Sequence, residues 1–428
     1  MKQAVRYSVP AVVTAFVLTG CGVTTTGTST SSTRASSPAA PTTTPATAST
    51  VPTLPSVPVG YKSTYNVLQT QLPVFSALSS SSGATTPGST VISSALEPAD
   101  GNVMRPGILQ TNSLDSSTTM LHRMKAIGET GVTIQVSFPL LVSSFPDSSE
   151  YTTYYQDIAQ VVHQEGMTLT VEENPLFGNI STLPISSYYA GLSLQSYGVA
   201  DHQMAQTIIN ALHPAYLSIL TEPDTYTAVI HNPGVDLNSV ARGLQFVNTV
   251  MSGLQKDGTM VGAGTGTWTD PSYDQMLLAQ TAIDYIDMHV YPIAQVDLNN
   301  MIRQVAAAVA THKPLIMSEC WLYKEGTDGS PLDGPQAAPT EQKVGTYSFW
   351  EPLDEQFLTA VVRYARASKF LVVSPFSTLN FFAYQTFTPA LDAQTSTEVR
   401  SSFDHLVSAA LVSGQLSAVG QAYRRLAA

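Results

Sequence analysis

The sequence contains few charged residues, and few of those are basic. Only 12% of its 428 residues are charged, and 19 Lys and Arg against 31 Asp and Glu give a formal net charge of -12. No basic stripe is present to neutralise phosphates, so nucleic acid is excluded as a partner. A hydrophobic content of 43% is typical of a globular protein. Because so little of the surface is charged, solubility depends on Ser and Thr hydroxyls, and a neutral polymer is the better fit as a partner.

The sequence also lacks the common metal and nucleotide motifs. It has only two cysteines, no Cys-His cluster with metal-ligand spacing and no P-loop. The glycine-rich stretch 262–266 follows an apolar run, as a dinucleotide-binding loop does, but Thr267 stands where the third glycine is required. We therefore expect no cofactor, no metal and no nucleotide partner.

No hydrophobic run is long enough to be a stable membrane span. The first one, Val9 to Leu18, follows Lys2 and Arg6 and has the length of a signal peptide. The sequence Leu18-Thr19-Gly20-Cys21 resembles the lipobox of bacterial lipoproteins, which implies cleavage after residue 20 and lipidation of Cys21. An ordinary secretory signal with a chance cysteine is the alternative. Both predict an extracytoplasmic protein, and the lipobox further predicts a lipid anchor in the bacterial cell envelope.

Composition divides the rest of the chain. Residues 21–59 are almost entirely Ser, Thr, Pro, Ala, Val and Gly, which bury too little surface to fold, so we expect a disordered tether. Residues 60–104 carry apolar side chains at helical spacing and are predicted to be an N-terminal extension of the folded domain. Residues 105–428 are predicted to form that domain.

From Arg105 onward, apolar strand-like runs alternate with segments of helical periodicity. This pattern is typical of parallel β/α units, and eight such units over about 300 residues predict an α/β fold of the (β/α)8 TIM barrel type. An open doubly wound sheet is the alternative. The predicted strands are Gly107–Gln110, Thr133–Phe138, Met167–Glu172, Tyr216–Thr221, Met260–Thr265, Tyr285–Tyr291, Leu315–Glu319 and Phe370–Pro375.

Two glutamates follow the fourth and seventh of these runs. Glu222 lies in Leu-Thr-Glu-Pro-Asp, and Glu319 lies in Met-Ser-Glu-Cys-Trp. The carboxyl ends of barrel strands meet at one mouth, so the two side chains are expected to face a common cleft. Paired carboxyl groups on opposite sides of a bond are what glycosidic cleavage requires.

The arrangement resembles clan A of the glycoside hydrolases. In that clan an acid/base glutamate follows strand four, a nucleophilic glutamate follows strand seven, and a His-x-Tyr sequence ends strand six, as His289-Val290-Tyr291 does here. The resemblance implies that Glu319 attacks the anomeric carbon, that Glu222 holds a proton for the leaving oxygen, and that configuration is retained. Tyr291 would then bond the nucleophile and His289 would line the sugar site.

The chain departs from the clan at two positions. Thr221 precedes the acid/base residue where the clan usually has Asn, and the segment from Gln135 to Pro139 lacks the arginine that many of these families carry at the end of strand two. We expect Thr221 to contact the sugar with a shorter reach.

Aromatic and polar residues near the same strand ends are candidate sugar contacts, because sugar faces stack on aromatic rings. Trp321 and Trp268 are the expected platforms, and a core role is an equal alternative for Trp268. Glu173 and Asn174, after strand three, are expected to add polar contacts.

Three functions remain open. The first is a membrane-tethered retaining glycoside hydrolase that cleaves a β-linked poly- or oligosaccharide. The second is a catalytically impaired barrel that serves as a carbohydrate-binding surface lipoprotein. The third is an unrelated scaffold lipoprotein, for which Glu222 and Glu319 would not share a cleft.

Overall fold

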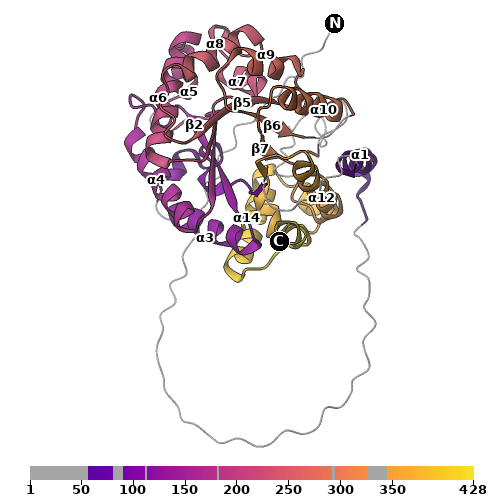
Figure 1. The fold of residues 1–428 in the computed structure, drawn as a ribbon. Coiled ribbons are helices and arrows are strands. Elements are labelled where there is room, and N and C mark those ends of the chain that lie inside the picture. The colour runs from indigo at the N-terminus through magenta and orange to yellow at the C-terminus, as the bar shows by residue number, and fades with distance from the viewer. Residues whose placement is uncertain (1–55, 81–89, 111–112, 181–182, 292–294, 325–344) are drawn as a thin grey trace, which may run out of the picture.

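The eight strands form one parallel sheet. The computed structural model describes residues 56–80, 90–110, 113–180, 183–291, 295–324 and 345–428. Neighbouring strands follow the order β1-β8-β7-β6-β5-β4-β3-β2, with helices around them (Figure 1). The strands are β1 Val91–Ile92, β2 Gly131–Phe138, β3 Thr168–Pro175, β4 Tyr216–Ser218, β5 Met260–Gly266, β6 Tyr285–Val290, β7 Leu315–Cys320 and β8 Val372–Pro375.

The short strand β1 closes the sheet into a barrel. On one side it pairs with β8, with Val91 opposite Val372. On the other side Thr130 N donates to Ile92 O at 2.9 Å and Thr133 N donates to Ser94 O at 3.0 Å. These bonds join the first strand to both neighbours, so the predicted (β/α)8 barrel is confirmed and the open sheet is excluded.

The prediction of the first strand was wrong. Residues 107–110 were expected to be extended, but Arg105–Leu109 form a 3-10 helix, η3. Pro106 has no N–H to give to a sheet, and so short an apolar run does not distinguish a strand from a helix by periodicity. The true first strand lies within residues 60–104, the segment assigned to the N-terminal extension.

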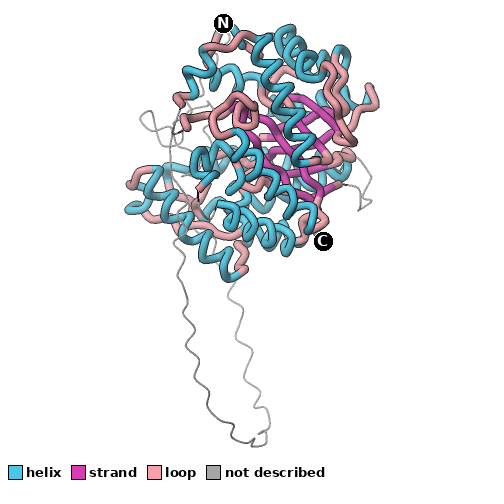
Figure 2. Tube along the Cα trace, turned by 90° about the vertical axis from the view of Figure 1, so that its left-hand side faces the viewer, coloured by secondary structure: helices cyan, strands magenta, loops and turns pink. Residues whose placement is uncertain are grey.

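The strands form the barrel wall in the interior of the molecule, and helices surround them (Figure 2). The tyrosine-rich stripe that begins at Tyr151 forms α4, and Gly166, two residues after it ends, adopts a φ of +64°. The helices are α1 Lys62–Ser80, α2 Gly101–Met104, α3 Ser113–Ile127, α4 Ser148–Gln164, α5 Ile185–Ala190, α6 Leu194–Leu212, α7 Pro223–Ile230, α8 Val240–Met251, α9 Ser272–Gln280, α10 Gln295–Ala310, α12 Glu351–Ala367, α13 Pro389–Asp392, α14 Ser396–Ser413 and α15 Ala418–Ala427.

Helix α1 belongs to the folded body. It packs against α12 at the side of the barrel (Figure 1). Leu68, Leu72 and Phe75 are fully buried there. The ring of Tyr65 stacks on Trp350 with centroids 5.6 Å apart. The apolar side chains at helical spacing that the sequence shows in this segment therefore form the face of α1 that packs against α12.

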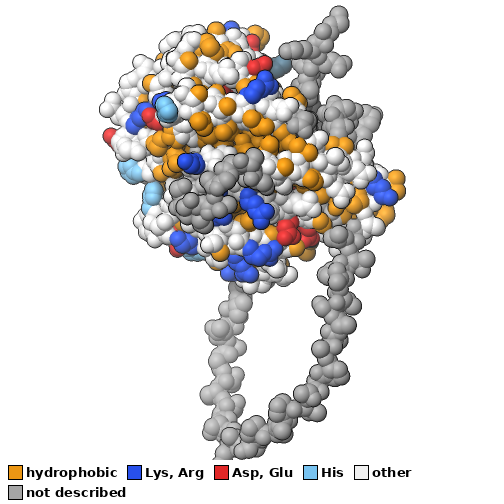
Figure 3. Space-filling model, turned by 45° about the vertical axis from the view of Figure 1, so that its right-hand side comes forward, with side chains coloured by type: hydrophobic (Ala, Val, Ile, Leu, Met, Phe, Trp, Pro, Cys, Tyr) orange, Lys and Arg blue, Asp and Glu red, His pale blue; other side chains and the backbone are white. Residues whose placement is uncertain are grey.

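The surface of the described residues carries few charged side chains, as the low charged content of the sequence predicts. Charged side chains are sparse on the face shown in Figure 3, where uncharged and hydrophobic atoms predominate. Among the described residues, no helix has the length and apolar character needed to cross a membrane. The predicted signal peptide, Cys21 and the tether up to residue 55 lie outside the described residues.

Candidate active site

Glu222 and Glu319 reach the barrel mouth from different elements. β4 is shorter than predicted and ends at Ser218, but Gly264 N still donates to Leu220 O at 2.8 Å, so the chain follows β5 as far as the glutamate. Glu222 is the residue before α7, and Pro223 opens that helix, a position that proline suits. Glu319 lies inside β7. Their side chains are 17% and 11% exposed respectively.

Both glutamates meet at His289, a buried residue of β6. His289 Nδ1 lies 2.7 Å from Glu222 Oε1 and 3.9 Å from Glu319 Oε1. The two carboxylate oxygens therefore lie no further apart than the sum of those distances. That upper bound is close to the smallest carboxyl separation of inverting glycosidases, roughly 6.5 Å, and allows the roughly 5 to 5.5 Å of retaining ones. The two predicted catalytic residues thus lie together at one histidine.

Glu319 receives two hydrogen bonds from neutral side chains. The Tyr291 hydroxyl donates to Oε1, and Gln135 Nε2 donates to Oε2 at 2.6 Å. Gln135 lies within β2, in the segment 135–139 that lacks the arginine expected from the resemblance. Sequence reasoning missed its role because a glutamine carries no charge to draw attention.

The pKa shifts of the two glutamates are opposite to the roles expected from the sequence, in which Glu222 holds the proton and Glu319 is ionised. Burial would raise the pKa of Glu222, but the hydrogen bond and charge of His289 outweigh it and lower that pKa. Burial, with the nearby charges of Glu172 and Glu222, raises the pKa of Glu319 to about 8 despite His289 and Tyr291. Glu319 therefore holds a proton at neutral pH, while Glu222 is ionised.

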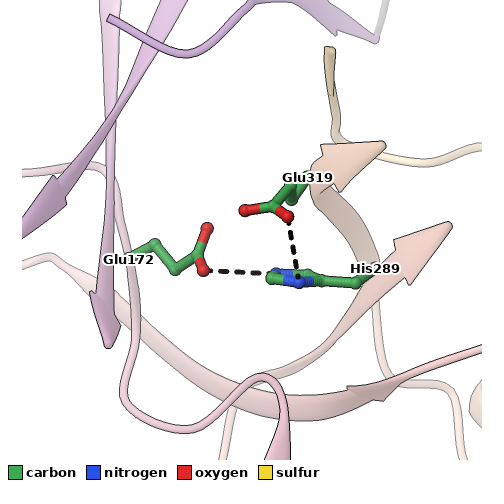
Figure 4. A group of neighbouring side chains, drawn as sticks. All are labelled: Glu172, His289 and Glu319. Carbon is green, nitrogen blue, oxygen red and sulfur yellow. Dashed lines mark ion pairs between the residues drawn. The ribbon is translucent and has the colours of Figure 1, made fainter. Parts of the chain in front are cut away.

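A third carboxylate, Glu172, lies beside them and was not predicted as a site residue. It belongs to β3, and its Oε1 lies 3.4 Å from His289 Nε2. Figure 4 shows Glu172 and Glu319 directed at the same imidazole from different strands. The sequence could have indicated it, because Glu172 ends the predicted third strand. Strand residues alternate in direction, so Glu172 and Glu173 point to opposite sides and only one of them can face the barrel axis.

A register shift brings two consecutive residues of β7 to the same histidine. Successive strand residues normally point to opposite faces. Pairing of β7 with β8 slips between Met317 and Cys320, and Ser318 Oγ lies 3.2 Å from His289 Nε2 while Glu319 faces Nδ1. Strand seven thus supplies two neighbouring polar groups to one site.

The histidine and its carboxylates superficially suggest two other kinds of site. Glu172, His289 and Glu319 each offer a ligand atom, and these atoms lie within 4.8 Å of one another. Both ring nitrogens are already engaged, by Glu222 and by Ser318, so we assign no metal to them. The sequence of contacts from Ser318 to His289 to Glu222 also resembles a hydrolase triad. Ser318 is only 1% exposed, so a substrate carbonyl group does not reach it, and its hydroxyl proton is donated to Glu172 and not to His289.

Trp268 stands at the wall of the site. It is half-buried, and its ring lies 5.6 Å from that of Tyr291. Its Nε1 donates to Asp224 Oδ2 at 2.8 Å, which fixes the ring beside Glu222's helix. Half-buried Tyr323, which was not predicted, stands edge-on to Tyr291 with the ring centroids 5.6 Å apart. These three rings, Trp268, Tyr291 and Tyr323, form what we call the aromatic wall.

Trp321 does not join the aromatic wall. It is 1% exposed and packs edge-on against Phe357 of α12, with Lys324 Nζ 5.0 Å from its ring centre. The prediction that it is a sugar platform is corrected, because its ring is covered on the core side of the strand end.

The remaining predicted contacts are polar groups held by the protein itself. Thr221 Oγ1 donates to Glu172 Oε1 at 3.3 Å. Asn174 Oδ1 accepts from Asn102 Nδ2 and from Ser137 Oγ, at 3.0 and 2.9 Å. Glu173 points away from the barrel axis toward Asp201 of α6, as strand alternation requires, and burial together with Asp201 raises its pKa well above the usual value. Glu173 is therefore not a sugar contact in this structure.

The chain is similar to several solved structures at low sequence identity. No protein-family model and no curated protein matches the chain. An exo-beta-1,4-mannosidase from Opitutaceae bacterium strain TAV5 is 12% identical with a TM-score of 0.47, over 77% of this chain and 63% of that one. A GH5_18 variant from Bifidobacterium longum, in complex with Manb1-4GlcNAc, is 10% identical with a TM-score of 0.49, over 79% and 78%. An L-talarate/galactarate dehydratase from Salmonella typhimurium is 11% identical with a TM-score of 0.38, over 74% and 55%.

Proposed function

We propose that the protein is a retaining glycoside hydrolase in which Glu319 is the nucleophile and Glu222 the acid/base. One observation carries the proposal: two glutamates from the fourth and seventh strand ends meet at one histidine in the mouth of a (β/α)8 barrel. A strand-end carboxylate alone is often structural, whereas two that share a partner at the catalytic face of this fold are typical of a catalytic pair.

In the first step Glu319 attacks the anomeric carbon and forms a glycosyl-enzyme. Glu222 gives its proton to the leaving oxygen. Tyr291 and Gln135 keep the nucleophile oriented through the two oxygens that they contact. In the second step Glu222 removes a proton from water, the water attacks the same carbon, and Glu319 leaves, so the original configuration is restored.

The first step requires a proton to move before the bond breaks. Glu319 holds a proton at neutral pH, and Glu222 needs one. His289 Nδ1 lies within 3.9 Å of an oxygen of each carboxylate. We infer that the His289 imidazolium gives its Nδ1 proton to Glu222 when the sugar binds, and that the proton of Glu319 is lost to solvent before the attack.

The proposed substrate is a β-linked poly- or oligosaccharide outside the cytoplasm. The aromatic wall supports a sugar ligand, because ring faces of pyranoses pack on aromatic surfaces. A net charge of -12 favours a neutral polymer over an acidic one. The lipobox-like sequence before Cys21 supports tethering of the barrel to the cell envelope.

Reducing-end release from a panel of β-linked glycans tests the proposal. The protein starting at residue 56 should release sugar, and Glu319→Gln should lower the rate at least about 10³-fold. Glu355→Gln is the matched control, because Glu355 is a surface residue of α12 with a 42% exposed side chain paired with Arg425. Release by Glu319→Gln equal to that of the control would refute the assignment.

Azide distinguishes the two glutamates. In Glu319→Ala, azide should attack the substrate from the vacated nucleophile side and give a product of inverted configuration. In Glu222→Ala, it should attack the glycosyl-enzyme and give a product of retained configuration. The reverse pattern would exchange the two roles.

A second candidate is a carbohydrate-binding barrel without catalysis. It is favoured by Thr221, whose hydroxyl is committed to Glu172 and leaves the sugar without the contact that the clan's Asn makes. Binding of one glycan, measured by calorimetry, with no release from the whole panel would support this function over hydrolysis.

A further inference from the structure

Glu172 is held in one orientation at the Nε2 side of His289, the ring that both catalytic glutamates contact. It is 2% exposed, and two hydroxyl groups donate to it: Thr221 Oγ1 to Oε1 and Ser318 Oγ to Oε2, each at 3.3 Å. Among the described residues its ion-pair partner is His289, whose Nε2 lies 3.4 Å from Oε1. These contacts fix both oxygens of the Glu172 carboxyl group beside the ring of His289.

Ser318 fixes the tautomer of His289. Its hydroxyl gives its single proton to Glu172, so its oxygen is left to accept from His289 Nε2 at 3.2 Å. Nε2 therefore carries a hydrogen, and the second ring nitrogen, Nδ1, faces Glu222 at 2.7 Å. A proton on Nδ1 as well makes the ring an imidazolium between two carboxylates.

The charges that face His289 come from three elements. Glu172 lies on β3, Glu222 precedes α7 and Glu319 lies on β7, while Tyr291, just after β6, donates to Glu319. Burial alone would lower the pKa of His289, but the charge of Glu172, followed by that of Glu319, raises it well above its usual value. The charge of Glu172 also raises the pKa of Glu319.

We propose that Glu172 is a positioning residue whose charge keeps His289 as the imidazolium facing Glu222 and Glu319, and so sets the pH range in which the two glutamates work. Glu172 acts on Glu222 through His289, whose Nε2 faces Glu172 and whose Nδ1 faces Glu222. It also acts directly on Glu319, because ligand oxygens of the two lie within 4.8 Å of each other. The inference rests on the proposed glycosidase function for its effect on rate, and on the geometry alone for its effect on His289.

The first test is the pH profile of kcat/KM in Glu172→Gln and Glu172→Asp. Removal of a negative charge weakens proton binding at every neighbouring group, so the Gln variant should shift the profile toward acid by about one pH unit. The Asp variant keeps the charge and should stay near the wild-type profile. A uniform loss of rate in Glu172→Gln without a shift would show a merely structural role and overturn the proposal.

The second test needs no turnover. In protein labelled with ¹³C at histidine Cε1, the signal lost in His289→Gln identifies His289, and its titration is followed by NMR in the wild type and in Glu172→Gln. We expect the titration to move to lower pH in Glu172→Gln and to be restored in Glu172→Asp. An identical titration in wild type and Glu172→Gln refutes the inference even if the enzyme is active. A shifted titration without hydrolysis of any glycan sustains the inference and refutes the proposed function.

Thermal unfolding of each variant shows whether it folds. If Glu172→Gln does not fold, Glu172→Ala removes the same charge without adding an amide donor, and the same shift in the titration of His289 is expected. An unshifted His289 in that variant overturns the proposal equally.

Discussion

At the scale of single residues, the hydrogen bond from Tyr291 to Glu319 favours the ionised nucleophile. That bond lowers the pKa of Glu319, against the burial that raises it to about 8. Glu319 attacks only when ionised, so kcat/KM should rise with pH through about 8. Tyr291→Phe removes the donor, and should therefore move this rise to higher pH and lower the rate near neutrality by about tenfold or more.

The pH dependence of kcat/KM on one soluble glycoside, in wild type and Tyr291→Phe, measures this effect. Tyr323→Phe is the control, since it alters a phenol of the same aromatic wall whose ring stands edge-on to Tyr291. A rise at the same pH in wild type and Tyr291→Phe would contradict the role given to the phenol.

Individual residues also show what sequence reasoning can reach. Glu222, Glu319, His289 and Tyr291 were found because strand ends of one barrel share a mouth, and the structure brings all four together. Trp321 was misplaced because its distance along the chain from Glu319 says nothing about which side of the strand end it covers. Ser318 was missed because a register shift within β7 leaves no trace in the sequence. Glu172 was missed although it ends the predicted third strand, because attention went to the two residues that follow it.

At the scale of secondary-structure elements, α1 is predicted to be essential for stability. The Phe75 ring is fully buried and lies 6.1 Å from Phe357 and 5.8 Å from Tyr364, both on α12. Phe75→Ala leaves a cavity between the two helices and should lower the free energy of unfolding by about 3 to 4 kcal/mol.

Urea denaturation of the protein starting at residue 56 measures the loss. Val74→Ala is the matched control, since Val74 is 40% exposed on the same helix and should change the midpoint little. An effect of Phe75→Ala no larger than that of Val74→Ala would mean that α1 is not docked on α12 in solution.

Helix α10 shows a limit of reading periodicity. The three- and four-residue spacing of Leu298, Ile302, Val305 and Val309 predicts that these side chains form the inner face. In the structure, however, Ile302 is 42% and Val309 61% exposed. The buried face includes Met301 and Gln304 instead, and Gln304 Nε2 donates to Asp274 Oδ2 at 2.7 Å. A buried glutamine is invisible to a count of apolar residues, so the helix was found but its rotation was wrong.

At the scale of the whole molecule, buried carboxyl groups without a cation should make stability depend on pH. Burial raises the pKa of Glu129 to about 8, of Asp201 to about 8 and of Asp274 to about 7. These groups bind a proton more tightly in the folded chain than in the unfolded one. Their stabilisation is therefore complete below the unfolded pKa values near 4 and is lost as pH rises through about 7 to 8.

The free energy of unfolding should fall by about 1.4 kcal/mol per pH unit for each such group between its two pKa values. Thermal unfolding between pH 5 and pH 9 should show a steady decrease of Tm. Glu129→Gln, which removes one titrating group bonded by Ser94, should flatten that slope, and an unchanged slope would contradict the assignment.

The overall architecture was predictable because eight alternating segments leave few arrangements for a parallel sheet. The place where the barrel closes was not. Two residues, Val91 and Ile92, make the seam, and no pattern distinguishes a two-residue strand from the loops around it. The proton positions were also out of reach, because they depend on three carboxylates that the sequence separates by up to 147 positions, from Glu172 to Glu319.

The seam at β1 imposes an order on biosynthesis. The strand that emerges early from the ribosome has β8, which emerges last, as one of its neighbours. Contacts across almost the whole chain then fasten it, among them Thr378 Oγ1 to Ala95 O and Tyr423 OH to Ser93 O. The nascent chain consequently stays unclosed until residue 373 has been made, and contacts between residues so far apart in the chain form slowly. For the export that we propose, such a delay would keep the chain unfolded for longer, and passage through a secretion channel requires an unfolded chain.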